Sequence, residues 1–358
     1  MGILLFNFFI CLILAYILYL GSPKEDIIKD KLYFAYALIL LVFFHSFIDP
    51  ESVPDVEVYR NVFNRLASKP IIGAFFDGDD SEYGENFEVG YKFFLSLVGQ
   101  IWQNINFFLF VNSVVLCFLY LKFFRKYSPL FGISVLLFIL LPFNQSLFVL
   151  RQHLSLAILL LSYDYIIEQK FWKFMLVVII AMMIHMSSII FVPVYFLYKV
   201  KKKKTLFILL FAGLLMALAV RYVLSFVAVI LANSERYSGY GDDVSVGIAT
   251  KGLIMLMVFF CYCWTLRGRI WEDGINRLVF VISLWGTLFN LVIGEAGAGR
   301  IFLCYYFIML IQIPIIIVNI ENKVLKSLFV FGAITCFAIF SYAISADARS
   351  LENFSLMF

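Results

Sequence analysis

Residues 141–198 read LPFNQSLFVLRQHLSLAILLLSYDYIIEQKFWKFMLVVIIAMMIHMSSIIFVPVYFLY. Within this stretch, Arg151 and His185 interrupt sequence that otherwise has the composition of helices buried in lipid. A cationic side chain inside a membrane span costs a few kcal/mol even on a lenient insertion scale, so it usually faces a cavity or a partner. These two residues are therefore the first candidates for a functional site.

The composition of the whole chain predicts a polytopic membrane protein. Of its 358 residues, 63% are hydrophobic and 15% are charged, whereas a soluble domain has roughly 25% charged residues. Apolar runs close to the ~20 residues of a membrane-spanning helix recur along the chain. The net charge of +4 says little by itself, and no nucleic-acid partner is expected. All six cysteines lie in apolar runs, where they are expected to act as packing residues.

The charges of the loops predict an orientation in the membrane. By the positive-inside rule, the loop with three lysines at 22–31 is cytoplasmic, so the N-terminus and the next loop fall on the outer side. That outer loop, 49–104, carries ten acidic and four basic residues between Asp49 and Lys92. Within it, Phe87 to Trp102 has apolar and aromatic residues at helical spacing, as expected of a helix lying in the outer interface.

Continued alternation predicts about twelve membrane segments in an all-α, single transmembrane domain covering residues 1–358. The expected segments are 3–20, 32–48, 106–124, 130–141, 147–167, a pair within 172–198, 206–232, 248–266, 278–293, 301–320 and 328–344. We see no sequence repeat of the kind that builds the two halves of many transporters.

The segment 172–198 is 27 residues long, which as one helix would measure about 40 Å. Lysines 170 and 173 precede it, and lysines 199 and 201–204 follow it. A single tilted crossing would place one of these basic clusters outside, whereas a hairpin of two short helices keeps both inside. We therefore expect a re-entrant hairpin with His185 to Ser188 at its tip, close to Arg151.

This topology gathers the candidate functional residues at the outer face: Asp55, Tyr59, Arg60, Glu88, Arg151, Gln152, His185, Glu295 and Arg300. Arginine offers planar, permanently charged donors that suit phosphate oxygens. The competing interpretation is that each arginine pairs with a carboxylate, for example Arg300 with Glu295, or extends to lipid headgroups. His185 could bind phosphate or transfer a proton, or it could be a neutral side chain bonded to a carbonyl of the hairpin.

The carboxylates Asp55, Glu57 and Glu88 are candidates for a general base. Glycosyl transfer to a hydroxyl group requires removal of its proton, a task that suits a carboxylate. Asp77, Asp79, Asp80 and Glu82 lie in a turn-like region and are expected to be solvated charges. Neither a glycine-rich phosphate loop, nor a metal cluster, nor a nucleophile elbow is visible, so we expect no metal and no cofactor.

Five short motifs appear in a defined order: Asp55-Val-Glu-Val-Tyr59-Arg60, Phe87-Glu88-Val-Gly90-Tyr91, Arg151-Gln152-His153-Leu154-Ser155-Leu156-Ala157, His185-Met186-Ser187-Ser188 with Pro193 downstream, and Arg300 followed by Tyr305-Tyr306-Phe307 and Pro314. Through these motifs the chain resembles the EpsG family of bacterial exopolysaccharide membrane proteins, which are Wzy-like polysaccharide polymerases. The usual small residue after Arg-Gln is His153 here, a departure that could alter the local pocket.

The resemblance implies a GT-C-like glycosyltransferase without a nucleotide-sugar site. Such an enzyme joins oligosaccharide repeat units, carried on undecaprenyl diphosphate, at the outer face of the bacterial cytoplasmic membrane, and thus contributes to exopolysaccharide or O-antigen synthesis. Its partners would be the lipid-linked donor and acceptor and the surrounding membrane lipids, and whether a regulator sets chain length stays open.

This implied activity gives each candidate residue an expected role. Arg151, Arg300 and His185 hold the donor diphosphate, while Asp55 or Glu88 deprotonates the acceptor hydroxyl. Gln152, Tyr59, Arg60 and Glu295 complete the substrate-binding set.

Two other functions share some of these features. A flippase for lipid-linked oligosaccharides or another transporter also needs cations within the membrane, but it favours inverted repeats and charges on both leaflets. A membrane O-acyltransferase would want a paired catalytic histidine and an acyl-donor site facing the cytoplasm. A single outer cavity closed to the cytoplasm would distinguish the polymerase from both.

Overall fold

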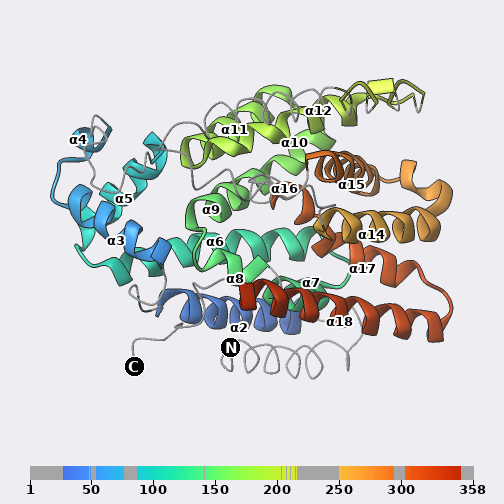
Figure 1. Ribbon diagram of the computed structural model, residues 1–358, viewed down its shortest axis with the longest axis horizontal. Helices are drawn as coiled ribbons and strands as arrows, with labels where there is room; N and C mark the ends of the chain where they lie inside the picture. The colour runs from blue at the N-terminus through green and yellow to red at the C-terminus, as the bar shows by residue number, and fades with distance from the viewer. Residues whose placement is uncertain are drawn as a thin grey trace, which may run out of the picture. The chain divides into compact units, whose positions relative to one another are not determined.

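The computed structural model describes residues 27–47, 49, 54–75, 87–140, 142–202, 250–293 and 303–347, together with parts of 204–215. Every regular element in these ranges is a helix, which confirms the all-α class for the described part of the chain (Figure 1). The chain divides into two compact units. The expectation of a single transmembrane domain over 1–358 stays a prediction.

The first unit contains most of the N-terminal half, the end of α11 from Val177, and the C-terminal helix. Its helices are α2 (Ile27–Ser46), α3 (Pro54–Ala67), α4 (Ile71–Phe75), α5 (Val89–Ile101), α6 (Ile105–Tyr127), α7 (Phe131–Leu140), α8 (Pro142–Ser146), α9 (Leu150–Leu159), the C-terminal part of α11 (Phe171–Ile184), and α18 (Lys323–Asp347).

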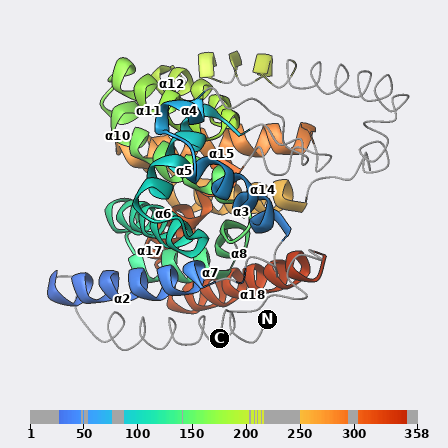
Figure 2. The same ribbon diagram turned by 90° about the vertical axis from the view of Figure 1, so that its left-hand side faces the viewer.

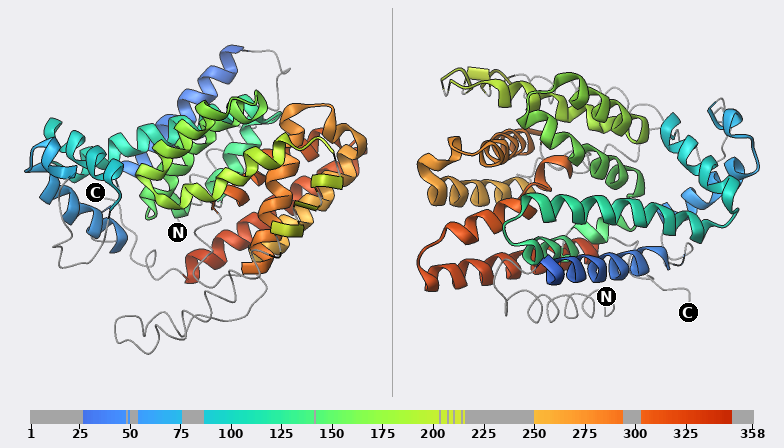
Figure 3. Two further views of the ribbon diagram at one scale, coloured as in Figure 1. Left: turned by 90° about the horizontal axis from the view of Figure 1, so that it is seen from above. Right: turned by 180° about the vertical axis from the view of Figure 1, so that it is seen from behind.

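Helix α6 is 23 residues long, and α2 lies along it (Figures 1 and 3). Its start is fixed by Asn104, whose side chain accepts the backbone N–H groups of Asn106 and Phe107 at 2.8 and 3.3 Å. Such a cap satisfies amide groups that have no partner inside the helix. At the other end, Arg125 pairs with Asp30 and joins the two helices.

Helix α5 is the expected helix of the loop 49–104, and it packs against α3 and α4 (Figure 2). A Cβ atom on Gly99 would lie 2.6 Å from the Cβ of Ala67, so only glycine allows this closeness of α5 to α3. Gln103 secures the same contact by donating to the carbonyl of Ala67 at 3.0 Å. The described parts of the loop therefore form a helical layer; its placement outside the membrane stays a prediction.

The second unit contains Ser162–Leu176 and Ser187–Asn319. Its elements are α10 (Tyr163–Ile167), the start of α11, the 3₁₀ helix η3 (Met186–Phe191), α12 (Val192–Lys199), α14 (Thr250–Leu266), the 3₁₀ helix η5 (Arg267–Trp271), α15 (Gly274–Ile293), α16 (Leu303–Tyr306) and α17 (Met309–Asn319). Helix α14 contacts both α15 and α17, which Figure 1 shows above and below it.

The motif Tyr305-Tyr306-Phe307 forms part of the core of the second unit. All three side chains are buried. The Tyr305 hydroxyl accepts a hydrogen bond from Trp285 Nε1 at 3.0 Å and donates to the carbonyl of Ile190. Through Tyr305 this motif therefore links α15, α16 and η3.

The predicted hairpin is confirmed as a helix–turn–helix. Helix α11 ends at Ile184, η3 follows, and α12 begins at Val192. The ring centroids of Phe174 and Tyr195 lie 5.0 Å apart, and the Tyr195 hydroxyl donates to the carbonyl of Gln169 at 2.9 Å. A continuous helix would hold these positions about 30 Å apart, so the chain reverses at the predicted tip.

Among the described residues, two helices are long and apolar enough to cross a membrane, Ile105–Tyr127 and Gly252–Trp271. Several others are apolar but shorter. Two expected spans are interrupted: 147–167 by a 3₁₀ turn at Leu160–Ser162, and 301–320 by a turn at residues 307–308. The spans 3–20 and most of 206–232 lie outside the described residues. The count of twelve segments and the GT-C-like architecture stay predictions.

Candidate functional site

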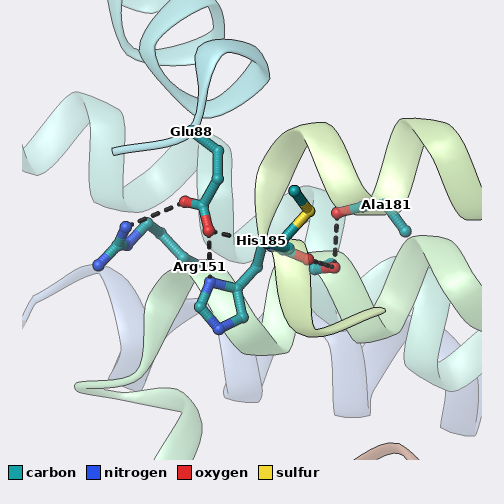
Figure 4. A network of polar contacts seen from close by, with 6 residues as sticks. Glu88, Arg151, Ala181 and His185 are labelled. Atoms are coloured by element: carbon teal, nitrogen blue, oxygen red, sulfur yellow. Dashed lines mark hydrogen bonds and ion pairs between the residues drawn. The ribbon is translucent and has the colours of Figure 1, made fainter. Parts of the chain in front are cut away.

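Three segments of the first unit meet at one carboxylate. Glu88 lies immediately before α5, Arg151 lies in the first turn of α9, and His185 directly follows α11. Figure 4 shows the side chains of Arg151 and His185 reaching the Glu88 carboxylate from different elements. The sequence placed all three residues in the candidate site, and the structure brings them into contact.

Both oxygens of Glu88 are engaged. Its Oε2 accepts from Arg151 Nη1 at 3.0 Å, and its Oε1 accepts from His185 Nδ1 at 2.9 Å and from the backbone N–H of Met186 at 3.0 Å. Burial by itself would raise the pKa of this carboxyl, but the hydrogen bonds from His185 and Met186 and the charge of Arg151 lower the pKa to about 2. Glu88 is therefore a fixed anion at neutral pH and a weak base.

Arg151 is held between a carboxylate and an aromatic ring. Its guanidinium carbon lies 4.1 Å from the centroid of Phe87, and its side chain is only 17% exposed. Stacking and ion pairing together fix the plane of the guanidinium. Of the alternatives for Arg151, pairing with a carboxylate is realised, and the carboxylate is Glu88.

The ring of His185 is oriented through its Nδ1 atom. Because a carboxylate only accepts, the contact with Glu88 places a proton on Nδ1. Within the described part of the chain, Nε2 has no hydrogen-bond partner, and Figure 4 shows it directed away from Glu88. The ring is bonded to a carboxylate and not to a carbonyl of the hairpin. The side chain is 21% exposed, so Nε2 lies at a partly open position.

The end of α11 is stabilised from two sides. Glu88 accepts the N–H of Met186, where the α-helical ladder gives way to η3. Ser155 on α9 donates to the carbonyl of Ala181 at 2.7 Å. Ser155 and Arg151 are four residues apart, which places both on one face of α9. The sequence reasoning missed Ser155, although this spacing from Arg151 was available to identify it.

Gly90 allows the start of α5 to approach α11. A Cβ atom at this position would lie 2.7 Å from both the Cβ and the carbonyl oxygen of Met183. Real Cβ atoms do not approach so closely, and backbone cannot give way as the end of a flexible side chain can. The glycine in the motif Phe87-Glu88-Val-Gly90-Tyr91 thus lets Glu88 reach the tip of the hairpin.

We expect Gly90→Ala to displace α5 from α11 and to weaken the network around Glu88. Overpacking of this kind typically costs about 1–3 kcal/mol. The measurement is the thermal unfolding of the purified protein. Gly332→Ala is the matched control, because no atom lies within 4 Å of an added Cβ there. Equal behaviour of the two variants would contradict this account of Gly90.

Tyr59 lies beside the site in a buried aromatic cluster. Its ring centroid is 5.3 Å from that of Phe87 and 5.9 Å from that of Tyr91. This cluster supports the ring on which Arg151 stacks. Arg60 pairs with Glu57 at 3.5 Å within α3.

The remaining candidates are only partly placed. Asp55 belongs to α3, but its side chain lies outside the described residues, as do Glu295 and Arg300. Gln152 lies in α9 and is partly exposed. Whether these residues reach the site of Glu88 stays a prediction.

The other two histidines are buried and bonded to neighbouring helices. His45 Nδ1 lies 2.8 Å from the Ser113 hydroxyl, and His153 Nδ1 lies 3.0 Å from the Tyr120 hydroxyl. His153, which replaces the usual small residue after Arg-Gln, thus points into the contact between α9 and α6. No group of three His, Cys, Asp or Glu side chains that could hold a metal ion occurs in the described ranges.

Comparison with known proteins agrees with the motifs that meet at this site. The EpsG family matches residues 51–356, which include Glu88, Arg151 and His185. No curated protein and no solved structure matches the chain significantly. Because the match covers most of the sequence, the chain belongs to the EpsG family, which is associated with polysaccharide polymerases.

Proposed function

We propose that this protein joins oligosaccharide repeat units, carried on undecaprenyl diphosphate, into a surface polysaccharide at the outer face of the cytoplasmic membrane. The observation that carries the proposal is the network of Glu88, Arg151 and His185 at the tip of the hairpin. It combines a fixed cation, a fixed anion and an imidazole in a protein otherwise dominated by apolar side chains, and such groups are retained in membrane proteins for function.

The chemistry of the donor explains why a cation is needed. When the glycosidic bond to the lipid diphosphate breaks, negative charge develops on the leaving oxygen. A preorganised cation at that point stabilises the transition state far more than it would in water. Arg151 donates from Nη1 to Glu88. We propose that the guanidinium also contacts the diphosphate, with Arg300 as a second contact.

The hairpin supports an outward-facing site. Lys170 and Lys173 lie at the start of α11, and Lys199 ends α12 and Lys201 follows it at the same end of the hairpin. The positive-inside rule assigns this basic end to the cytoplasm. His185 lies at the opposite end of α11, so the same rule directs it toward the outer side.

Deletion of the gene tests the proposal. We expect a strain without the protein to lose long surface polymer and to accumulate lipid-linked product of one repeat unit on the outer side of the membrane. The product is measured by gel electrophoresis, and its side by a glycan-degrading enzyme applied to intact cells. Re-expression of the wild-type chain should restore the polymer.

The side of accumulation distinguishes the alternative function. One-repeat product on the inner side would indicate a flippase and would overturn the polymerase. Full-length polymer lacking only acyl substituents would indicate an acyltransferase. An unchanged ladder of polymer lengths would show that the chain acts elsewhere.

A further inference from the structure

Glu88 has little capacity to act as the base that removes the acceptor proton. Its two oxygens already receive three hydrogen bonds, from Arg151, His185 and the Met186 N–H. Accepting a further proton would require one of these contacts to break and would remove the negative charge that faces Arg151. The same contacts hold the carboxylate in a single orientation, which is the behaviour of a positioning group.

His185, in contrast to Glu88, has an atom that can accept a proton. Nδ1 is occupied by Glu88, which fixes the neutral ring in the tautomer whose lone pair is on Nε2. That lone pair has no partner among the described residues, and the side chain is partly exposed. A carboxylate behind the ring also stabilises the imidazolium that forms when Nε2 takes a proton, as in the histidine–aspartate pair of hydrolases.

We propose that Nε2 of His185 accepts the proton of the acceptor hydroxyl, and that Glu88 is the residue that positions and charges the ring for this step. This inference rests on the proposed polymerase function. The hydroxyl oxygen forms its bond to the anomeric carbon of the donor as its proton moves to Nε2. The bond from that carbon to the diphosphate oxygen breaks, and the electron pair leaves with the lipid diphosphate.

The groups around the ring come from three elements. Glu88 precedes α5, Arg151 lies on α9, and the phenols of Tyr59 on α3 and Tyr91 on α5 belong to the aromatic cluster beside them. At neutral pH Glu88 is negatively charged and Arg151 is positively charged, and the two form an ion pair. The ring of His185 is thus the group of this network suited to take up and release a proton during turnover.

The test uses the full-length protein in lipid nanodiscs with a lipid-linked repeat unit as donor and acceptor, and it measures the initial rate of polymer formation. His185→Asn retains a donor for Glu88 but has no Nε2, so we expect a loss of about a hundredfold or more. Ile189→Leu is the control near the tip, because its side chain is exposed and has no part in the contacts of Glu88.

Glu88→Gln separates positioning from packing. The amide oxygen can still accept a hydrogen bond, but the negative charge is gone, so a protonated ring is no longer stabilised. We expect the maximal rate to fall in Glu88→Gln, but adding Glu88→Gln to His185→Asn should cause no further loss, because Glu88 acts through the ring. A purely structural role for Glu88 would lower the rate in both backgrounds.

The outcomes separate this inference from the function on which it rests. A wild-type rate in His185→Asn would overturn the assignment of the base and leave the polymerase intact. An equal loss from Glu88→Gln in the wild-type and His185→Asn backgrounds would overturn the role of Glu88. Absence of product with wild type under all conditions would overturn the polymerase itself, and this inference with it.

Discussion

Replacement of Arg151 by alanine should abolish polymer while the protein remains in the membrane. Loss of one group that stabilises developing charge typically costs on the order of a hundredfold or more in rate. The substitution also removes the counter-charge of Glu88, which is only 20% exposed. The measurement is polymer length on gels from cells in which the membrane level of each variant is checked by immunoblot.

Arg151→Lys is the informative partner of this variant. Lysine keeps the positive charge but loses the planar guanidinium and its stacking on Phe87. We therefore expect this variant to make less polymer than the wild type. Arg125→Ala is the control, since it removes an arginine of the same unit from a more exposed ion pair with Asp30. Full-length polymer from Arg151→Ala would show that the site is assigned wrongly, even though the family would stand.

Replacement of Glu88 by alanine should have a comparable effect for a different reason. It removes the acceptor of Arg151, of His185 and of the Met186 N–H in one step. We therefore expect loss of polymer together with a lower thermal stability of the purified protein. Glu168→Ala is the control, because it removes a carboxylate from a surface ion pair with Lys170, and such pairs contribute little.

The double variant Glu88→Ala/Arg151→Ala completes a thermodynamic cycle. Because the two side chains contact each other, their effects should not add, and the double variant should lose less stability than the sum of the two single variants. Additive losses would mean that the ion pair contributes nothing to the folded state.

The hairpin could be predicted because loop charge alone distinguishes it from a single helix. The basic clusters at both ends of 172–198 disfavour one crossing under the positive-inside rule, and the reversal at His185 agrees with that preference. Candidate residues were likewise found because a charge within apolar sequence is costly. Both inferences depend on properties of one segment alone: the charges that flank it and the cost of a charge within it.

The partners within the site could not be predicted in the same way. Glu88 lies 63 residues before Arg151 and 97 before His185, and hydropathy contains no information about which distant charges pair. From the sequence, the partner of Arg151 could therefore be either a phosphate or a carboxylate. Glu88 was interpreted as a general base without a partner. Ser155 was missed because its role depends on the carbonyl of Ala181 on another helix.

The carboxylate of Glu88 joins segments that leave the ribosome at very different times. Residue 88 is synthesised nearly a hundred residues before Met186, whose N–H it accepts. Arg151 follows 63 residues after Glu88, whereas His185 and the Met186 N–H follow nearly a hundred residues after it. The site is therefore complete only when 172–198 has folded, and a nascent chain that misfolds this segment leaves Glu88 without two of its three hydrogen-bond donors.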